Sequence, residues 1–289
     1  MSSDITGKAH SQSYYVWQRL KTNKGAMIGL IFLCILLVLM ISADFLFDYN
    51  EVVIKQKISE RKQPPSKEHW FGTDESGRDI LARVVHGSRR SVLISACAVL
   101  GATLVGGALG AVAGFYGGKI GEVIMRCMDM LMAIPSLLLG LVIVSCLGSS
   151  IPNLMLAVGI GAVPRMARIL RSSVMTCRSA DYVEAARARG ATNNWILLKH
   201  ILPNSISPIF VQVTVQIGTT ILILSSLSFL GLGVQPPTPE WGAMLSSART
   251  YIRDCSYMCL FPGLAILFTI LSLNLLGDGL RDALDPKLK

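Results

Sequence analysis

The chain has 289 residues, of which 52% are hydrophobic and only 16% are charged, and its mean hydropathy is +0.53. A soluble domain carries roughly a quarter of charged residues, so this composition excludes an ordinary soluble protein. Several apolar blocks reach the length of about 20 residues that crosses a bilayer. The sequence therefore predicts an all-α integral membrane protein with six transmembrane helices. The formal net charge of +9 does not indicate nucleic acid as a partner, because Lys and Arg lie between the apolar blocks, where they orient membrane proteins.

The chain begins with a polar segment and a long apolar block. Basic residues close to Trp17 predict that residues 1–24 lie on the cytoplasmic side. The first span is expected at 25–47, where Ile, Leu and Val abound and small residues are few, which favours a peripheral position facing lipid. The block is too long for the apolar region of a signal peptide, and no small-residue cleavage site follows it.

Residues 48–90 form the longest polar connection, which we assign to the extracytoplasmic side. Within it, Ile80, Leu81, Val84 and Val85 recur at helical spacing. An amphipathic helix over residues 76–86, lying on the membrane surface, fits this pattern. The connection carries many basic residues, so the charge bias that orients the chain is weak.

The remaining spans form a core over residues 91–277. The second span is rich in Gly and Ala, which allow close helix contact in lipid, and Pro135 is expected to kink the third. We place the five spans of this core at 91–115, 120–147, 153–170, 206–230 and 257–276. Six spans put both termini on one side, so residues 278–289 form a cytoplasmic tail.

Polar side chains within the spans are candidates for a transport path. Asp129 in the third span is a functional candidate because charge in a membrane is costly, although it can instead pair with Arg126 three residues earlier. Gln212, Gln216 and Thr219 share roughly one face of the fifth span. They either line a path or form hydrogen bonds between helices.

A polar and basic segment, residues 181–204, interrupts the apolar spans. Gly190 suits the left-handed position that ends a helix, Thr192 can cap a second short helix, and Pro203 lacks the N–H needed to continue it. The second helix would expose four consecutive apolar residues, 195–198. So apolar a run in a water-facing loop predicts a partner protein that receives it.

The sequence contains no recognisable catalytic or metal-binding motif. It has no G-x-x-x-x-G-K-[ST] phosphate loop and no H-E-x-x-H, and its four histidines, at positions 10, 69, 86 and 200, are dispersed. We therefore expect no catalytic residue, metal site or cofactor in this chain. Cys255 and Cys259 fall in a predicted external loop, where they either form a disulfide or remain buried thiols.

Four stretches carry a resemblance to a known family. They are EAAxxxG at residues 184–190 followed by Leu202-Pro203, FGTDESGRDILARVVHGSRRSV at 71–92, FLGLGVQPPTPEWGAML at 229–245, and residues 261–289. From about residue 15 to its end, the chain resembles ATP-binding-cassette (ABC) importer permeases of the dipeptide, oligopeptide and nickel branch, and within it the second subunit, of the permease C type. His200 departs from the wider signature, which usually has Ile there.

This resemblance implies a type I importer permease fold in a bacterial inner membrane, with both termini cytoplasmic. It implies as partners a homologous permease, two cytoplasmic ATPases that bind ATP and Mg, and an extracytoplasmic binding protein. Residues 72–90 would then contact the binding protein, seal the outer mouth or only brace the bundle. Peptides are the first expectation for the substrate, and nickel or other metal chelates or another small solute are the alternative. A stand-alone secondary transporter is a remote alternative, since internal repeats are not evident.

The resemblance also assigns roles to individual residues. The residues expected to couple the permease to an ATPase are Glu184, Ala185, Ala186, Arg187, Gly190, Trp195, Ile196, Leu197, Leu198 and Pro203. Glu184, Arg187 and Arg189 would form salt links to the ATPase, unless Glu184 and Arg187 merely pair along their own helix. Those expected along the translocation path are Asp129, Gln212, Gln216 and Thr219.

Overall fold

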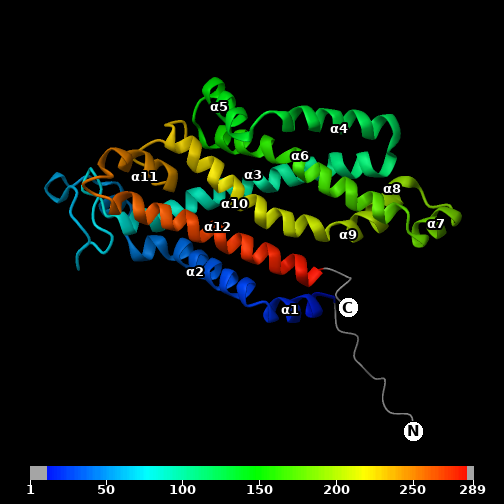
Figure 1. Ribbon diagram of the computed structural model, residues 1–289, viewed down its shortest axis with the longest axis horizontal. Helices are drawn as coiled ribbons and strands as arrows, with labels where there is room; N and C mark the ends of the chain where they lie inside the picture. Colours follow the sequence, from blue (N-terminus) through cyan, green and yellow to red (C-terminus); the bar gives the residue numbers. More distant parts are fainter. Residues whose placement is uncertain (1–11, 285–289) are drawn as a thin grey trace, which may run out of the picture.

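The computed structural model describes residues 12–284, which fold almost entirely into helices that run along one long axis (Figure 1). Five of these helices are long and apolar enough to cross a membrane. They are α2 (Lys24–Leu46), α3 (Ile80–Tyr116), α6 (Ile151–Arg178), α10 (Ser207–Phe229) and α12 (Tyr257–Leu284). The described residues thus show the predicted all-α fold.

The expected third span is broken rather than kinked. It consists of α4 (Gly118–Ala133) and α5 (Ser136–Leu147), which meet at an angle of 85°. The break lies at Ile134 and Pro135, where the residue before proline is forced into an extended conformation, with φ −90° and ψ 124°. Counted as one span, the pair brings the number of spans to six.

Close packing of α3 against α6 forms the centre of the bundle and confirms the prediction drawn from the small residues. A Cβ atom added at Gly106 would lie 2.4 Å from the carbonyl oxygen of Val163. One added at Gly110 would lie 2.2 Å from that of Ala167. Only glycine permits this approach of the two backbones, so these residues fix the distance between α3 and α6.

The predicted surface helix over residues 76–86 is wrong. Residues from Ile80 onward are the first turns of α3, which continues without a break through the second span, while residues before it form a turn. Asp79 caps the helix by accepting a hydrogen bond from the backbone N–H of Ala82 at 2.9 Å. The apolar positions that suggested a membrane surface pack instead inside the protein, as the 1% exposure of Ile80 shows.

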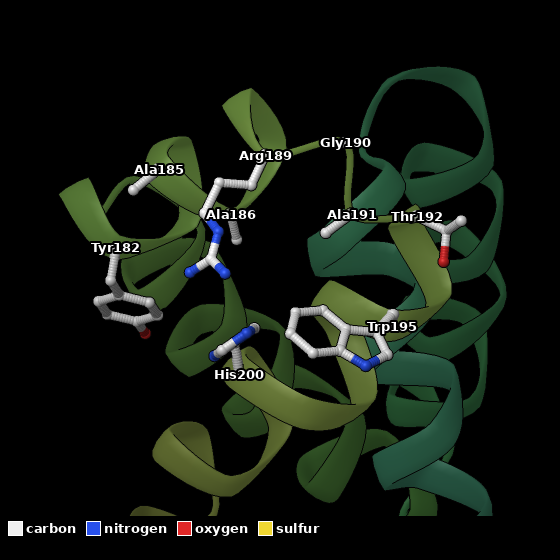
Figure 2. A pocket seen from close by; sticks show the side chains of 9 residues that line it. All are labelled: Tyr182, Ala185, Ala186, Arg189, Gly190, Ala191, Thr192, Trp195 and His200. Atoms are coloured by element: carbon white, nitrogen blue, oxygen red, sulfur yellow. The ribbon is translucent and has the colours of Figure 1, made fainter.

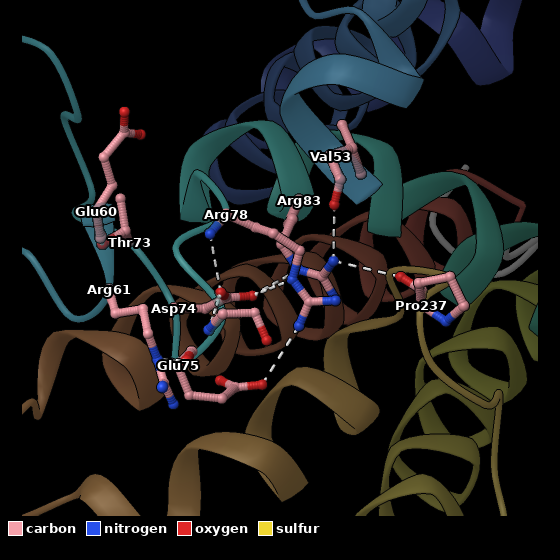
Figure 3. Close-up of polar contacts among 10 residues, drawn as sticks. Val53, Glu60, Arg61, Thr73, Asp74, Glu75, Arg78, Arg83 and Pro237 are labelled. Carbon is pink, nitrogen blue, oxygen red and sulfur yellow. Dashed lines mark hydrogen bonds and ion pairs between the residues drawn. The ribbon is translucent and has the colours of Figure 1, made fainter. Parts of the chain in front are cut away.

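Buried charges fold the rest of the connection into a cap over one end of the bundle (Figure 3). Asp74 accepts hydrogen bonds from the backbone N–H of Arg78 at 3.0 Å and from its side-chain Nε at 2.7 Å. Arg83, at the start of α3, donates to the carbonyl oxygens of Val53 at 2.9 Å and Pro237 at 3.3 Å. These contacts tie three distant stretches together, which explains why a polar connection is ordered here.

The same cap holds the short helix α11 (Trp241–Ala248). Glu240, fully buried, accepts hydrogen bonds from the backbone N–H groups of Gly242 at 3.0 Å and Ala243 at 2.9 Å, as an N-cap does. Its carboxylate also accepts from the Ser91 hydroxyl at 2.9 Å. The two cysteines of this region, Cys255 and Cys259, are both free, so the disulfide alternative is not formed.

Helical structure extends into both predicted terminal segments. An additional helix, α1 (Gln12–Thr22), lies within the amino-terminal segment, and α12 continues past the predicted end of the last span. Leu20, Ala26 and Ala283 form a small buried cluster that joins these parts. Residues 1–11 and 285–289 of the predicted segments lie outside the described residues. The first span is peripheral as expected, since only 17% of its apolar window is buried.

Candidate functional site

The 181–205 segment forms a compact projection at the end of the bundle opposite the cap (Figure 1). It contains α7 (Asp181–Ala188), α8 (Asn193–Ile196) and α9 (Leu202–Ser205), with one wider helical turn, Leu197–Ile201, between the last two. Gly190, between α7 and α8, has φ +81°, as predicted. The N–H of Ala191 donates to the carbonyl of Ala186 at 3.1 Å, which closes the end of α7. The predicted pair of short helices with a glycine corner is therefore present.

Two details of the second half differ from the expectation. Thr192 occupies the capping position of α8, but its side chain makes no capping hydrogen bond; its carbonyl accepts from the N–H of Ile196 at 3.0 Å. Pro203 does not end the segment. In the wider turn, the N–H of Leu202 donates to the carbonyl of Leu197. The hydrogen-bond register changes at this point, and Pro203, which has no N–H, follows directly. Helical structure can therefore continue through the proline to Ser205.

The apolar run 195–198 divides into an anchor and an exposed pair. Ile196 is 0% exposed and Leu197 is 9% exposed, whereas Trp195 is 48% and Leu198 is 64% exposed. The expectation that all four project from the protein is therefore wrong for Ile196 and Leu197. Helical geometry, with its turn of about 100° per residue, separates the run into two faces.

The buried face attaches the segment to the spans. Ile196, Leu197 and Ile201 pack in one core cluster with residues of α3, α6 and α7, which include Phe115, Leu170, Val174, Val183 and Ala186. The Tyr116 hydroxyl at the end of α3 adds a hydrogen bond to the Asn194 side-chain oxygen at 3.1 Å. A force applied to the segment is thus passed to α3 and α6, and also to α10, which follows α9 directly.

A cavity of about 530 Å³ opens between α7 and α8 (Figure 2). Its lining combines aromatic, small and basic side chains: Tyr182, Ala185, Ala186, Arg189, Gly190, Ala191, Thr192, Trp195 and His200. The rings of Trp195 and His200 meet edge to face, with centroids 4.5 Å apart. Burial raises the pKa of the Tyr182 phenol. Sequence reasoning missed this cavity, although three aromatic side chains within one short segment were visible.

The charged residues of α7 remain available to another molecule. Glu184, Arg187 and Arg189 are exposed. In the part of the chain that the structure describes, no ion pair joins Glu184 to Arg187, so the alternative that they merely pair along their own helix is not observed. The projection therefore combines exposed aromatic rings, a cavity and charges of both signs that form no ion pair with any described residue, on a firmly anchored base.

The candidate path residues do not gather into one site. Asp129 on α4 forms its ion pair with Arg168 on α6 at 2.7 Å, so the expected pairing with Arg126 is wrong. Both partners are about half exposed, at 53% and 52% of the side chain. Helix α4 packs against α6, so Asp129 pairs with a residue of α6 rather than with Arg126 of its own helix.

The glutamines and threonine of α10 are placed differently from one another. Gln216 is only 5% exposed, and its Oε1 has no hydrogen-bond partner among the described residues. Gln212 lines a cavity of about 320 Å³ with Arg281 and residues of α6 and α10. Thr219 donates to the carbonyl of Val215 in its own helix at 3.2 Å. Within residues 12–284, none of these three forms a hydrogen bond between helices, and their place on a path stays a prediction.

Comparison with known proteins identifies the family. Residues 106–289 match the model of the binding-protein-dependent transport system inner membrane component family. The chain belongs to this family. Residues 11–65 also match the N-terminal transmembrane domain of oligopeptide transport permease C. The chain is thus a membrane permease subunit, and the expectation of the permease C type is confirmed.

Curated relatives match almost the whole of this permease. The dipeptide transport system permease protein DppC of Alkalihalophilus pseudofirmus is 45% identical over 94% of this chain and 89% of its own length. The di/tripeptide transport system permease protein DppC of Pseudomonas aeruginosa is 43% identical over 94% and 91%. The glutathione transport system permease protein GsiD of Escherichia coli O157:H7 is 43% identical over 94% and 90%.

A solved structure supports the fold of the permease. A chain of the MetNI methionine ABC transporter, in an inward-facing conformation, superposes with a TM-score of 0.59. The match covers 71% of this chain and 98% of that chain at 16% identity. The type I permease fold expected from the sequence is confirmed.

Proposed function

We propose that this permease forms half of the transmembrane pathway of an ATP-driven importer for dipeptides and oligopeptides. A homologous permease supplies the other half, two cytoplasmic ATPases drive it, and an extracytoplasmic binding protein delivers the substrate. In this arrangement the 181–205 segment faces the cytoplasm, the cap faces outward, and both termini are cytoplasmic. ATP and Mg are bound by the ATPases, so the permease itself carries out no chemistry.

One observation carries the proposal: the 181–205 segment is built to receive another protein. Ile196 and Leu197 fix its base inside the permease, while Trp195 and Leu198 remain exposed beside a cavity with aromatic walls. Exposed aromatic side chains near a pocket are the residues that dominate protein–protein binding energy. The exposed Glu184 and Arg189 supply charges for the rim of such an interface.

The anchor also provides a mechanism for coupling. An ATPase that binds the exposed face and moves on ATP binding displaces the whole segment, because the Gly190 corner and the buried cluster hold α7 and α8 together. The displacement passes to α3, α6 and α10 through direct packing. These spans then shift relative to the second permease, which alternates access to the pathway.

Peptides are favoured as the substrate class by the relatives. Those with 43% to 45% identity over nearly the whole chain are named for dipeptide, di/tripeptide and glutathione transport. All of these cargoes contain peptide bonds, so nickel chelates and a stand-alone transporter are not favoured. Uptake of labelled dipeptide into vesicles with the whole importer, compared with uptake of a nickel chelate, tests the choice.

The docking role is tested by Trp195→Asp. A buried interface tryptophan contributes about 2 kcal/mol or more to binding, which corresponds to roughly a thirtyfold weaker association. Co-purification of the ATPases with the tagged permease should fall accordingly, while the permease still inserts in the membrane. The matched control is Trp70→Asp, since Trp70 is 69% exposed but belongs to the connection before α3 that forms the cap. Equal co-purification from both variants would refute docking at this segment.

A further inference from the structure

A further cavity of about 320 Å³, distinct from the one that Gln212 lines, lies at the end of the bundle opposite the proposed coupling segment. It is formed where the end of α2, the first third of α3 and the loop before α11 meet. Its lining consists of Asp44, Tyr49, His86, Arg89, Arg90, Leu93 and Pro239. Nothing in the proposed coupling or transport role makes use of it.

The cavity lies at the level where the protein leaves the apolar part of the membrane. Helix α2 ends at Leu46, and the apolar run of α3 begins just after Arg90. Large apolar side chains around this level are exposed: Phe45 by 92% and Leu93 by 54%. In an integral membrane protein such side chains contact lipid, so the cavity borders the lipid head groups.

Most of the charge in the cavity is already balanced. Arg89 forms an ion pair with Asp44 at 2.6 Å and donates to the backbone carbonyl oxygens of Met40 and of Ile41, the latter at 3.0 Å. These carbonyls lie near the carboxyl end of α2, where a positive charge is stabilising. The other oxygen of Asp44 lies 3.9 Å from Nδ1 of His86. His86 is buried, and its Nε2 lies 3.1 Å from the carbonyl oxygen of Phe47.

Arg90 is the exception. It is exposed, and it has no hydrogen bond or ion pair within residues 12–284. Because Asp44 offsets Arg89, the cavity retains one uncompensated positive charge, on a guanidinium whose parallel N–H groups match two oxygens of a phosphate. Beside it, Leu93 and Tyr49 provide apolar surface.

We infer that this cavity binds the phosphate group of an anionic membrane phospholipid. Arg90 holds the phosphate oxygens, Arg89 adds a positive field from behind, and the acyl chains lie along the exposed apolar side chains of α2 and α3. The charge balance favours a lipid with a net negative head group over a zwitterionic one. Assignment to the outer leaflet rests on the proposed orientation of the permease, whereas binding itself does not.

A bound lipid here would bridge α2 to the core of the bundle. Helix α2 is the least buried of the five unbroken spans, and at this end Arg89 and His86 tie its last turn and the residue that follows it to α3. A lipid whose phosphate is held by Arg90 on α3 and whose acyl chains lie along α2 adds a link between the same two helices, and this link depends on membrane composition. The lipid therefore stabilises the attachment of the first span.

Native mass spectrometry of the full purified chain tests the inference. The probes are phosphatidylglycerol, phosphatidylcholine and inorganic phosphate, and the variants are Arg90→Gln, Arg90→Lys and the control Arg253→Gln. Arg253 is also exposed and does not line the cavity. We expect Arg90→Gln to bind phosphatidylglycerol roughly fivefold more weakly, as the loss of one basic contact near a membrane surface implies. Arg253→Gln should bind like the unaltered chain, and Arg90→Lys should fall between them.

Three results would overturn the inference. The first is equal binding of phosphatidylglycerol by Arg90→Gln and Arg253→Gln. The second is binding of phosphatidylcholine as strong as that of phosphatidylglycerol. The third is displacement of phosphatidylglycerol by inorganic phosphate that binds the chain with the same affinity as the lipid. Thermal unfolding of each variant in detergent shows whether it folds. Because lipid binding is measured without the ATPases, its failure is distinct from a failure of the proposed transport role.

Discussion

The glycine corner at residue 190 offers a graded test of coupling. Gly190 has φ +81°, and an added Cβ would meet nothing within 4 Å, so a substitution there costs backbone strain and no steric clash with neighbours. Alanine in this left-handed conformation costs about 1–2 kcal/mol. Asparagine tolerates the region better than other non-glycine residues, and a β-branched valine tolerates it worst. The structure therefore predicts increasing distortion in the order Asn, Ala, Val.

A cost of 1–2 kcal/mol lowers the ratio of molecules with the native corner at residue 190 to molecules with a distorted corner by a factor of about 5 to 30. Peptide uptake per ATP hydrolysed, measured in vesicles that contain the whole importer, should decrease in the same order. Gly101→Ala is the matched control, since an added Cβ at Gly101 also meets nothing within 4 Å and Gly101 lies in the middle of α3 with an ordinary helical backbone. Wild-type coupling in Gly190→Val would show that the left-handed corner is not needed.

Two further predictions concern packing. Gly110→Ala places a Cβ 2.2 Å from the Ala167 carbonyl oxygen, so α3 and α6 must separate at a cost of about 1–3 kcal/mol. This variant should have a lower thermal unfolding temperature in detergent. In the control Gly107→Ala the Cβ would lie at an ordinary 3.5 Å from the Leu170 side chain, so this variant should unfold like wild type. Ile196→Asp buries an unpaired carboxylate in the core cluster that holds the 181–205 segment, so it should lower the unfolding temperature of the permease strongly. Leu198→Asp, at a position 64% exposed, should leave the unfolding temperature unchanged and weaken only ATPase association. Equal unfolding temperatures for either pair of variants would contradict the packing described.

The long apolar runs and the glycines predicted the main architecture from the sequence. Apolar runs of about the length that crosses a bilayer mark the spans. These runs must form helices because lipid offers no hydrogen-bond partner to exposed backbone N–H and C=O groups. Gly190 was predictable because its chemistry is local: the helix before it must end, and glycine accepts a positive φ at low cost. The small residues of the second span predicted that it packs closely in the bundle, and the structure places the closest contacts at Gly106 and Gly110.

The errors arose where contacts between distant elements decide the outcome. Pro135 predicts a kink but not the 85° break, which also depends on how α5 packs on α10, as at Gly140 against Leu227. Asp129 has a potential partner in its own helix, yet pairs with Arg168, 39 residues away. A run of four apolar residues is too short to show which face is buried, so the division of 195–198 required the structure.

Site-specific photo-cross-linking measures the central claim most directly, namely that the exposed face of the 181–205 segment contacts an ATPase. A photoreactive amino acid placed at Leu198 of the assembled importer should form a covalent adduct with an ATPase subunit. The same group at Leu104, 75% exposed on α3 within the membrane, should react with lipid or the other permease. An ATPase adduct from position 198 but not from position 104 is the predicted result. Absence of any ATPase adduct from position 198, with the importer active, would contradict the account.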